Sequence, residues 1–133
     1  MRVFVDSNIP MYVAGREHPL REPARRFLER VRNGEIEACT STEVLQEILY
    51  RYVALKRPDL AREVYDLFVQ LCAAVFPVTL ADTDRAKAII GRERLGVRDA
   101  IHCAVMLNND IRTIASFDSG FDNLKAIQRL ELN

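Results

Sequence analysis

The sequence predicts an α/β fold, in which a mainly parallel sheet carries helices on both faces. Three observations support this prediction. Short apolar segments alternate with longer amphipathic segments along the chain. The first of the short segments contains the continuous apolar run Val3 to Val5, which is typical of a strand buried on both faces of a parallel sheet. The length of 133 residues suits one domain, so we expect a single domain over residues 1–133.

The first part of the chain contains two predicted strands and three predicted helices. The first strand is a continuous apolar run, and the segment after it, which contains Pro10, is predicted as turn and loop. Ser41 or Thr42 caps the first of two long helices, and Pro58 separates that pair, which should form an antiparallel hairpin. These elements are expected at residues 2–5 (strand), 22–33 (helix), 36–40 (strand), 42–56 (helix) and 60–74 (helix).

The second part continues the alternation and ends with a strand at the edge of the sheet. Asp82 or Thr83 caps the next helix, and Gly96 ends it. Asp99 then opens a helix whose following residues are almost wholly apolar. The elements are expected at residues 75–79 (strand), 82–95 (helix), 99–107 (helix), 112–116 (strand) and 126–130 (strand).

Composition narrows the class of protein. Apolar residues make up 49% of the chain and charged residues 29%, as in folded proteins. The 19 basic and 19 acidic residues cancel, which argues against a general polyanion binder. No apolar run reaches the roughly 18 residues of a membrane span, so no membrane association is expected. The three cysteines are widely spaced in apolar surroundings, which predicts reduced thiols and a cytoplasmic location.

Acidic residues are predicted to gather at one edge of the sheet. Asp6 follows the first strand, Asp99 opens a buried helix, and Asp118 follows the strand over 112–116. The middle helix offers Glu43 and Glu47, which periodicity does not separate. Ligands of such sheets bind outside the carboxyl ends of the strands. Clustered carboxylates repel one another, and a hard divalent cation relieves that repulsion. We therefore expect a metal site suited to phosphodiester hydrolysis.

Several neighbours of these acids have two interpretations. Asn8 either orients Asp6 or forms a turn, and Ser116 either supports Asp118 through its hydroxyl or ends the strand. His102 is more typical of a buried core histidine than of a ligand. Arg98 either contacts a phosphate or pairs with an acid. No cluster of His and Cys predicts zinc, and no phosphate-binding glycine motif is present.

Basic residues crowd the segment after Asp6. Beside an acidic metal site they would guide a phosphate chain, although a solvated helix face explains them equally well. The candidates for binding such a phosphate chain are Arg16, Arg21, Arg25 and Arg26, with Arg98 in addition. A separate expectation concerns the predicted hairpin, whose apolar side chains, including Tyr50, Tyr65 and Val69, exceed what one sheet face needs. Part of it should be an interface with a second copy or with a partner helix.

Four stretches of the sequence resemble one known family. VFVDSN, EVLQEILYRY, RDAIHCAV and IASFDSGFDNL, in this order, resemble the PIN domain in its bacterial VapC-type toxin branch. The resemblance implies that the catalytic and metal-binding residues are Asp6, Glu47, Asp99 and Asp118, and it selects Glu47 over Glu43. Ser7 and Ser116 stand where the family has serine or threonine, so with Asn8 they would support the metal ligands.

The resemblance also implies a fold, a cofactor and partners. The fold would be a three-layer α/β/α sandwich. The activity would be that of a Mg²⁺- or Mn²⁺-dependent endoribonuclease acting on RNA, and the protein would be the toxin of a toxin–antitoxin pair. A cognate antitoxin that covers the site and a homodimer are the partners expected of such a protein.

Three alternatives stay open at this point. The chain would also suit a stand-alone RNA-processing nuclease of the same family, or a non-catalytic module that binds RNA or a protein partner. A phosphatase of the haloacid dehalogenase type also has an aspartate after its first strand. That chemistry needs a second aspartate two residues later, where this chain has Asn8.

Overall fold

A five-stranded, fully parallel sheet forms the centre of the molecule. The computed structural model describes residues 1–133. The strand order is β3-β2-β1-β4-β5, and each neighbouring pair is parallel. The strands are β1 (Arg2–Val5), β2 (Glu37–Ser41), β3 (Ala74–Phe76), β4 (Thr113–Ala115) and β5 (Gln128–Arg129). The predicted α/β fold with a mainly parallel sheet is therefore confirmed.

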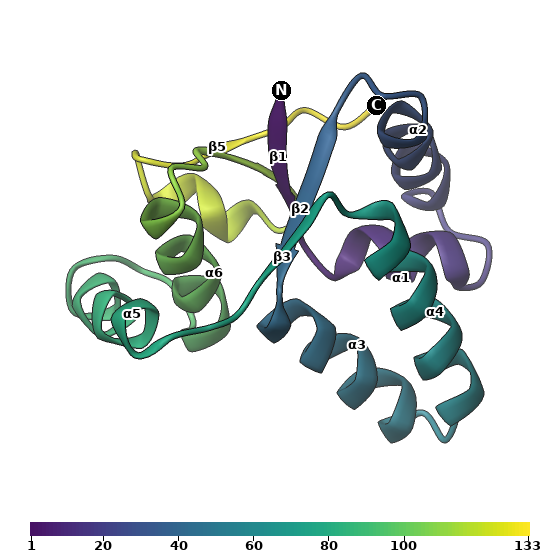
Figure 1. Cartoon of the computed structure of the whole chain (residues 1–133), viewed down its shortest axis with the longest axis horizontal. Helices are drawn as coiled ribbons and strands as arrows, with labels where there is room; N and C mark the ends of the chain where they lie inside the picture. The colour runs from purple at the N-terminus through teal and green to yellow at the C-terminus, as the bar shows by residue number, and fades with distance from the viewer.

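Helices lie on both sides of this sheet, as Figure 1 shows. In that view α5 and α6 lie to the left of the strands, and α1, α2 and α4 lie to the right. The helices are α1 (Asn8–Ala14), α2 (Arg21–Arg32), α3 (Thr42–Ala54), α4 (Pro58–Leu71), α5 (Leu80–Arg92) and α6 (Val97–Asn108), followed by the 3-10 helix η1 (Ser119–Asn123). The arrangement has the three layers that the sequence resemblance implied.

The central strand β1 sets the position of the cleft. Val3, Phe4 and Val5 are fully buried, as expected for a strand covered on both faces. Phe4 pairs with a residue of β2 on one side and of β4 on the other. The chain builds the sheet outward from β1 to β2 and β3, and later adds β4 on the opposite side. Between β1 and β4 the order reverses, and ligand crevices of open α/β sheets form at such a point.

Helix α1 was not predicted, because Pro10 was interpreted as a residue that prevents a helix. Proline breaks a helix interior because it lacks an N–H group and clashes with the preceding turn. Pro10 is the third residue of α1, however, where the backbone N–H has no partner within the helix anyway. The helix therefore starts at Asn8, directly after Asp6 and Ser7.

Four predicted boundaries were wrong. Pro58 begins α4 instead of only interrupting the hairpin, because proline is well suited to the first helical position. The same helix ends at Leu71, since the residues after it enter β3. Thr79, not Asp82, caps α5: its hydroxyl accepts the Asp82 N–H, and the Asp82 carboxylate accepts the Thr79 N–H. Gly96 is the N-cap of α6 instead of the end of α5.

Apolar side chains remain exposed on the α3–α4 hairpin, although Tyr65 and Val69, which were expected among them, are partly buried against the core. Tyr50 and Val53 of α3 are 66% and 59% exposed, and Leu67 of α4 is 60% exposed. The three cysteines are free, and two of them are buried. None of the helices has the length and hydropathy needed to cross a membrane.

Candidate active site

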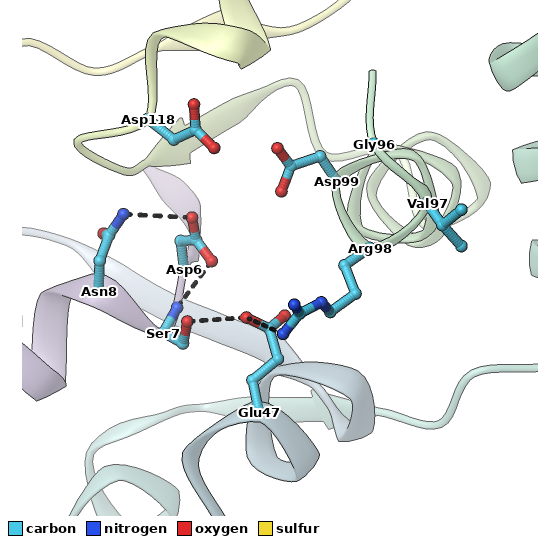
Figure 2. A pocket seen from close by; sticks show the side chains of 9 residues that line it. All are labelled: Asp6, Ser7, Asn8, Glu47, Gly96, Val97, Arg98, Asp99 and Asp118. Atoms are coloured by element: carbon cyan, nitrogen blue, oxygen red, sulfur yellow. Dashed lines mark hydrogen bonds and ion pairs between the residues drawn. The ribbon is translucent and has the colours of Figure 1, made fainter. Parts of the chain in front are cut away.

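A polar cleft opens at the carboxyl edge of the sheet, beside the reversal of strand order. It has a volume of about 560 Å³. All four predicted acids line it, although they come from four separate parts of the chain (Figure 2). The lining residues are Asp6, Ser7, Asn8, Glu47, Gly96, Val97, Arg98, Asp99 and Asp118. Glu43, the alternative acid of the middle helix, does not line this cleft.

Asp6 lies at the bottom of the cleft, where β1 ends, and only 5% of the residue is exposed. Its Oδ1 accepts the Ser7 N–H at 2.8 Å, and its Oδ2 accepts the Ser116 hydroxyl at 2.7 Å. Asn8 Nδ2 is a weaker donor to Oδ2 at 3.5 Å. Burial raises the pKa of Asp6, and the nearby His102 and the hydrogen bonds reverse only part of that effect.

Glu47 reaches the cleft from α3, and three groups hold its carboxylate. Oε2 accepts the Ser7 hydroxyl at 3.0 Å, and Oε1 lies 2.6 Å from His102 Nε2. Arg98 Nη1 lies 3.9 Å from Oε2. Burial opposes ionisation of Glu47, but the hydrogen bonds from His102 and Ser7 outweigh it, so its pKa lies below the ordinary value.

His102 is the functional neighbour that sequence reasoning did not assign to the site. It is fully buried, as predicted for a core histidine, but its Nε2 contacts Glu47 and lies 3.8 Å from Asp6 Oδ1. An ionised carboxylate only accepts hydrogen bonds, so Nε2 carries the proton of this contact. Burial lowers the pKa of His102, while the hydrogen bond to Glu47 and the charge of Asp6 raise it by more. Its Nδ1 is buried without a partner.

Asp99 and Asp118 form the outer part of the cleft. Asp99 is in the first turn of α6, and Asp118 follows β4 as the cap of η1, where its Oδ1 accepts the Gly120 N–H at 2.8 Å. Neither carboxylate forms an ion pair with a basic side chain. Burial, together with the neighbouring carboxylates of Asp118 and Asp6, raises the pKa of Asp99 to about 7.

The donor set fits a hard divalent cation. The available ligand atoms are carboxylate oxygens, and a cation would relieve the repulsion that raises the pKa of Asp99. Asp6, Glu47 and His102 also offer ligand atoms within 4.8 Å of one another. Gly120 keeps the outer side open, because a Cβ there would lie 3.1 Å from Asp118 Oδ1 and 3.7 Å from Asp99 Oδ2.

The predicted supporting residues contact the acids, with one change of partner. Ser7 contacts both Asp6 and Glu47, and Asn8 Nδ2 also donates to Ser116 Oγ at 3.2 Å. The sequence left open whether Ser116 supports Asp118 through its hydroxyl or only ends the strand. That hydroxyl donates to Asp6 instead, because Asp6 ends the strand next to β4, and it accepts the Asp118 N–H at 3.0 Å.

The predicted arginines are divided among different surroundings. Arg98 lines the cleft and pairs with Glu47, one of the two roles left open by the sequence, while its contact with a phosphate stays a prediction. Arg25 and Arg26 form ion pairs with glutamates of their own helix α2. Arg16 and Arg21 form no ion pair. None of the four arginines outside α6 lines the acidic cleft.

Comparisons with known proteins give consistent matches. The family model described as PIN domain matches residues 3–127. The chain is 42% identical to Ribonuclease VapC13 of Mycobacterium tuberculosis, a match that covers 96% of this chain and 98% of the relative. It is 38% identical to Ribonuclease VapC23 of the same species, over 87% and 92% of the two chains.

Solved structures match the fold. A structure of VapBC2 from Rickettsia felis bound to a promoter DNA fragment matches with a TM-score of 0.78 and 16% identity over all of both chains. The M. tuberculosis toxin VapC20, which cleaves the sarcin-ricin loop, matches with a TM-score of 0.73 and 20% identity, over 87% of this chain and 89% of that one. At these identities the likeness concerns the fold alone.

Proposed function

Because the chain belongs to the PIN domain family, we propose that it is a metal-dependent endoribonuclease and the toxin of a toxin–antitoxin pair. The observation that carries this proposal is the convergence of Asp6, Glu47, Asp99 and Asp118 on one cleft at the carboxyl edge of the sheet. The relatives named as VapC ribonucleases support the same activity, since they match nearly the whole chain.

We propose Mg²⁺ or Mn²⁺ as the cofactor. Asp6 and Asp99 would be its closest ligands, with Glu47 and Asp118 completing the site partly through water. A divalent cation, when bound, supplies acidity to a water molecule and stabilises charge on the phosphate oxygens. No covalent nucleophile is then required, in keeping with a cleft whose only hydroxyl-bearing lining residue, Ser7, is hydrogen-bonded to Glu47.

The side chains around the acids have separate tasks. Ser7, Ser116 and His102 hold the carboxylates of Asp6 and Glu47 in fixed orientations. Arg98, whose side chain is 61% exposed at the cleft, provides a positive charge for the phosphate of an incoming substrate. An unpaired strand suits a recessed site, because a stiff duplex would meet the cleft walls before its phosphate reached the acids.

A pair of variants on one helix tests this assignment. Glu47→Gln should abolish Mg²⁺-stimulated cleavage of unstructured RNA, whereas Glu43→Gln, one helical turn away, should cleave as the parent does. Asp6→Asn should behave like Glu47→Gln. Cleavage by Glu47→Gln or Asp6→Asn at the parental rate would refute the proposed site. Release of phosphate from small esters, without RNA cleavage, would indicate the phosphatase instead.

We also propose two partners: a cognate antitoxin and a second copy of the chain. Solved complexes of related fold include VapBC assemblies, which supports an antitoxin. The exposed apolar side chains of the α3–α4 hairpin, among them Tyr50, Val53 and Leu67, offer a surface for either partner. Light scattering tests the dimer: a strict monomer at micromolar concentration, with and without salt, would leave only the antitoxin for this surface. The free cysteines favour a cytoplasmic location.

A further inference from the structure

Three aromatic rings from distant parts of the chain lie in a row. Tyr12 is on α1, His18 is in the loop between α1 and α2, and Phe117 follows β4. The centroids of the Tyr12 and His18 rings are 4.7 Å apart, with 33° between the ring planes. The edge of one of the Tyr12 and Phe117 rings meets the face of the other, with centroids 5.6 Å apart. We call these three side chains the ring stack.

The ring stack begins at the rim of the acidic cleft. Phe117 is between Ser116 and Asp118 in the chain, and its N–H donates to Asn8 Oδ1 at 3.4 Å. Tyr12 lies one helical turn after Asn8 on α1, so the two side chains share a face of that helix. Figure 2 shows Asn8 and Asp118 on the side of the cleft away from Arg98. The rings therefore extend from the side of the cleft opposite to Arg98.

The outer end of the ring stack is accessible and held in place. Tyr12 and Phe117 are half-buried, whereas His18 is exposed. His18 Nδ1 accepts the Leu20 N–H at 3.1 Å, which fixes the orientation of the imidazole in an otherwise irregular loop. An exposed aromatic ring held in this way buries little apolar surface of its own. Its position is consequently better explained by a ligand that stacks on it than by the stability of the core.

Positive charge without a partner lies beside this outer ring. His18 and Arg21 line a second depression together with two acids, Glu17 and Glu22, and with Pro19 and Arg25. Arg25 forms ion pairs with Glu22 and Glu29. Arg21 forms no ion pair, and neither does Arg16 at the start of the loop between α1 and α2. Proteins that bind unpaired nucleic acid combine such unpaired basic side chains with aromatic rings on which bases stack.

We propose that the ring stack holds an unpaired RNA base next to the phosphate positioned for cleavage, and that Arg16 and Arg21 bind the phosphates beyond it. This inference rests on the proposed ribonuclease function and adds the element that holds the substrate. Stacking accepts every base, because each has a π face. The ring stack therefore fixes where the strand lies in the cleft and leaves sequence preference to other contacts.

Variants of His18 test the ring separately from the fold, because the residue is exposed in a loop. Binding is measured by fluorescence anisotropy of a short, labelled, unstructured RNA with Ca²⁺ in place of Mg²⁺, and intact RNA is verified on a gel. His18→Leu, which keeps apolar volume but removes the ring, should weaken binding about tenfold. His18→Phe, which keeps a ring, should bind within about twofold of the parent. Equal binding by all three proteins would overturn the proposal.

Abasic nucleotides locate the stacked base. In the parent, one abasic position should weaken binding about as much as His18→Leu does. In His18→Leu that position should no longer matter, because its stacking partner is gone. Equal sensitivity to every position in both proteins would overturn the proposal. The proposal would also be overturned if His18→Leu bound RNA as tightly as the parent but no longer bound a protein partner. The rings would then serve that partner.

The arginines provide a second comparison. Arg16→Gln/Arg21→Gln should flatten the dependence of log affinity on log salt by about 1.4, for two lost contacts with a single strand. Arg25→Gln/Arg26→Gln should change it little, because those charges are already paired within α2. Cleavage by the parent tests the nuclease function independently. If the parent binds RNA, and His18→Leu weakens that binding, but the parent does not cut RNA, the nuclease function is refuted and the ring stack is retained. If the parent does not bind RNA, both proposals are refuted.

Discussion

The inner and outer carboxylates of the cleft differ in what surrounds them. Asp6 and Glu47, the inner pair, accept hydrogen bonds from Ser7, Ser116 and His102. Asp99 and Asp118, the outer pair, have no basic partner, and the pKa of Asp99 is raised to about 7. Hydrogen bonds within the protein therefore orient the inner pair, whereas the two carboxylates of the outer pair repel each other in the metal-free protein.

This difference separates two contributions to one metal site. The inner pair would give the proposed site its geometry, because hydrogen bonds hold its carboxylates in place without an ion. The outer pair would supply affinity for the proposed ion, because binding would remove the repulsion between its charges. Removing a hydrogen-bond donor from the inner pair and removing a charge from the outer pair should consequently change the stability of the metal-free protein in opposite directions.

The largest effect on stability is expected from His102→Leu. The change leaves Glu47 without its shortest hydrogen bond in a mostly buried place, which should destabilise the metal-free protein by about 3 kcal/mol. The loss of orientation should also reduce metal affinity about 10- to 100-fold. Urea unfolding and metal titration measure the two effects. His102→Gln retains an N–H donor and should recover part of both, so equal losses in the two variants would contradict the orienting role.

Asp99→Asn should have the opposite sign. With a folded-state pKa of about 7, the Asp99 carboxyl retains a proton that the unfolded chain loses near pH 4. The metal-free parent should thus lose stability as pH rises from about 4 to about 7. Asn cannot ionise, so the variant should be more stable than the parent by about 1 kcal/mol at pH 8 after solvent screening, and not at pH 4.

Urea midpoints in EDTA at pH 4 and pH 8 measure this crossover. Mg²⁺ at pH 8 should then raise the midpoint of the parent more than that of Asp99→Asn, because only the parent retains the full set of charged ligands. A variant less stable than the metal-free parent at pH 8 would show that the outer pair is not held in repulsion.

A smaller effect is expected from Gly120→Ala. The added methyl would lie 3.1 Å from Asp118 Oδ1, so the carboxylate must shift by a few tenths of an ångström. The backbone of Gly120 is ordinary for any residue, so stability should change by less than about 1 kcal/mol. Metal affinity should fall a few-fold, since the shifted group belongs to the outer pair. An unchanged affinity would place the cation away from Asp118.

Sequence patterns predicted which acids of the site lie at strand ends better than they predicted the contacts between its side chains. Asp6 and Asp118 each follow an apolar run that was predicted as a strand. Their positions at the edge of the sheet were therefore predictable from the pattern of apolar residues along the chain. Glu43 and Glu47 are one turn apart on the same helix, and periodicity does not tell which reaches a cleft. The resemblance to a family chose Glu47, and the structure places that residue in the cleft.

The missed features depend on contacts between distant segments. His102 has the pattern of a core residue, and nothing in that pattern shows that its Nε2 reaches across to α3. Tyr12 and Phe117 are far apart in sequence and meet only because β1 and β4 are neighbours. Helix α1 was missed because of Pro10. In a sequence, a proline in the first turn of a helix cannot be told from a proline that interrupts a helix.

The order in which the acids occur along the chain has a consequence for synthesis. A polypeptide leaving the ribosome contains Asp6 and Glu47 well before it contains Asp99, His102 and Asp118. β1 and β2 can pair early, but β4, which carries the last acid to the rim, joins β1 only after α3 to α6 have been made. An unfinished chain thus has no complete cleft, so the proposed cleavage of RNA requires a chain that has been made at least as far as Asp118.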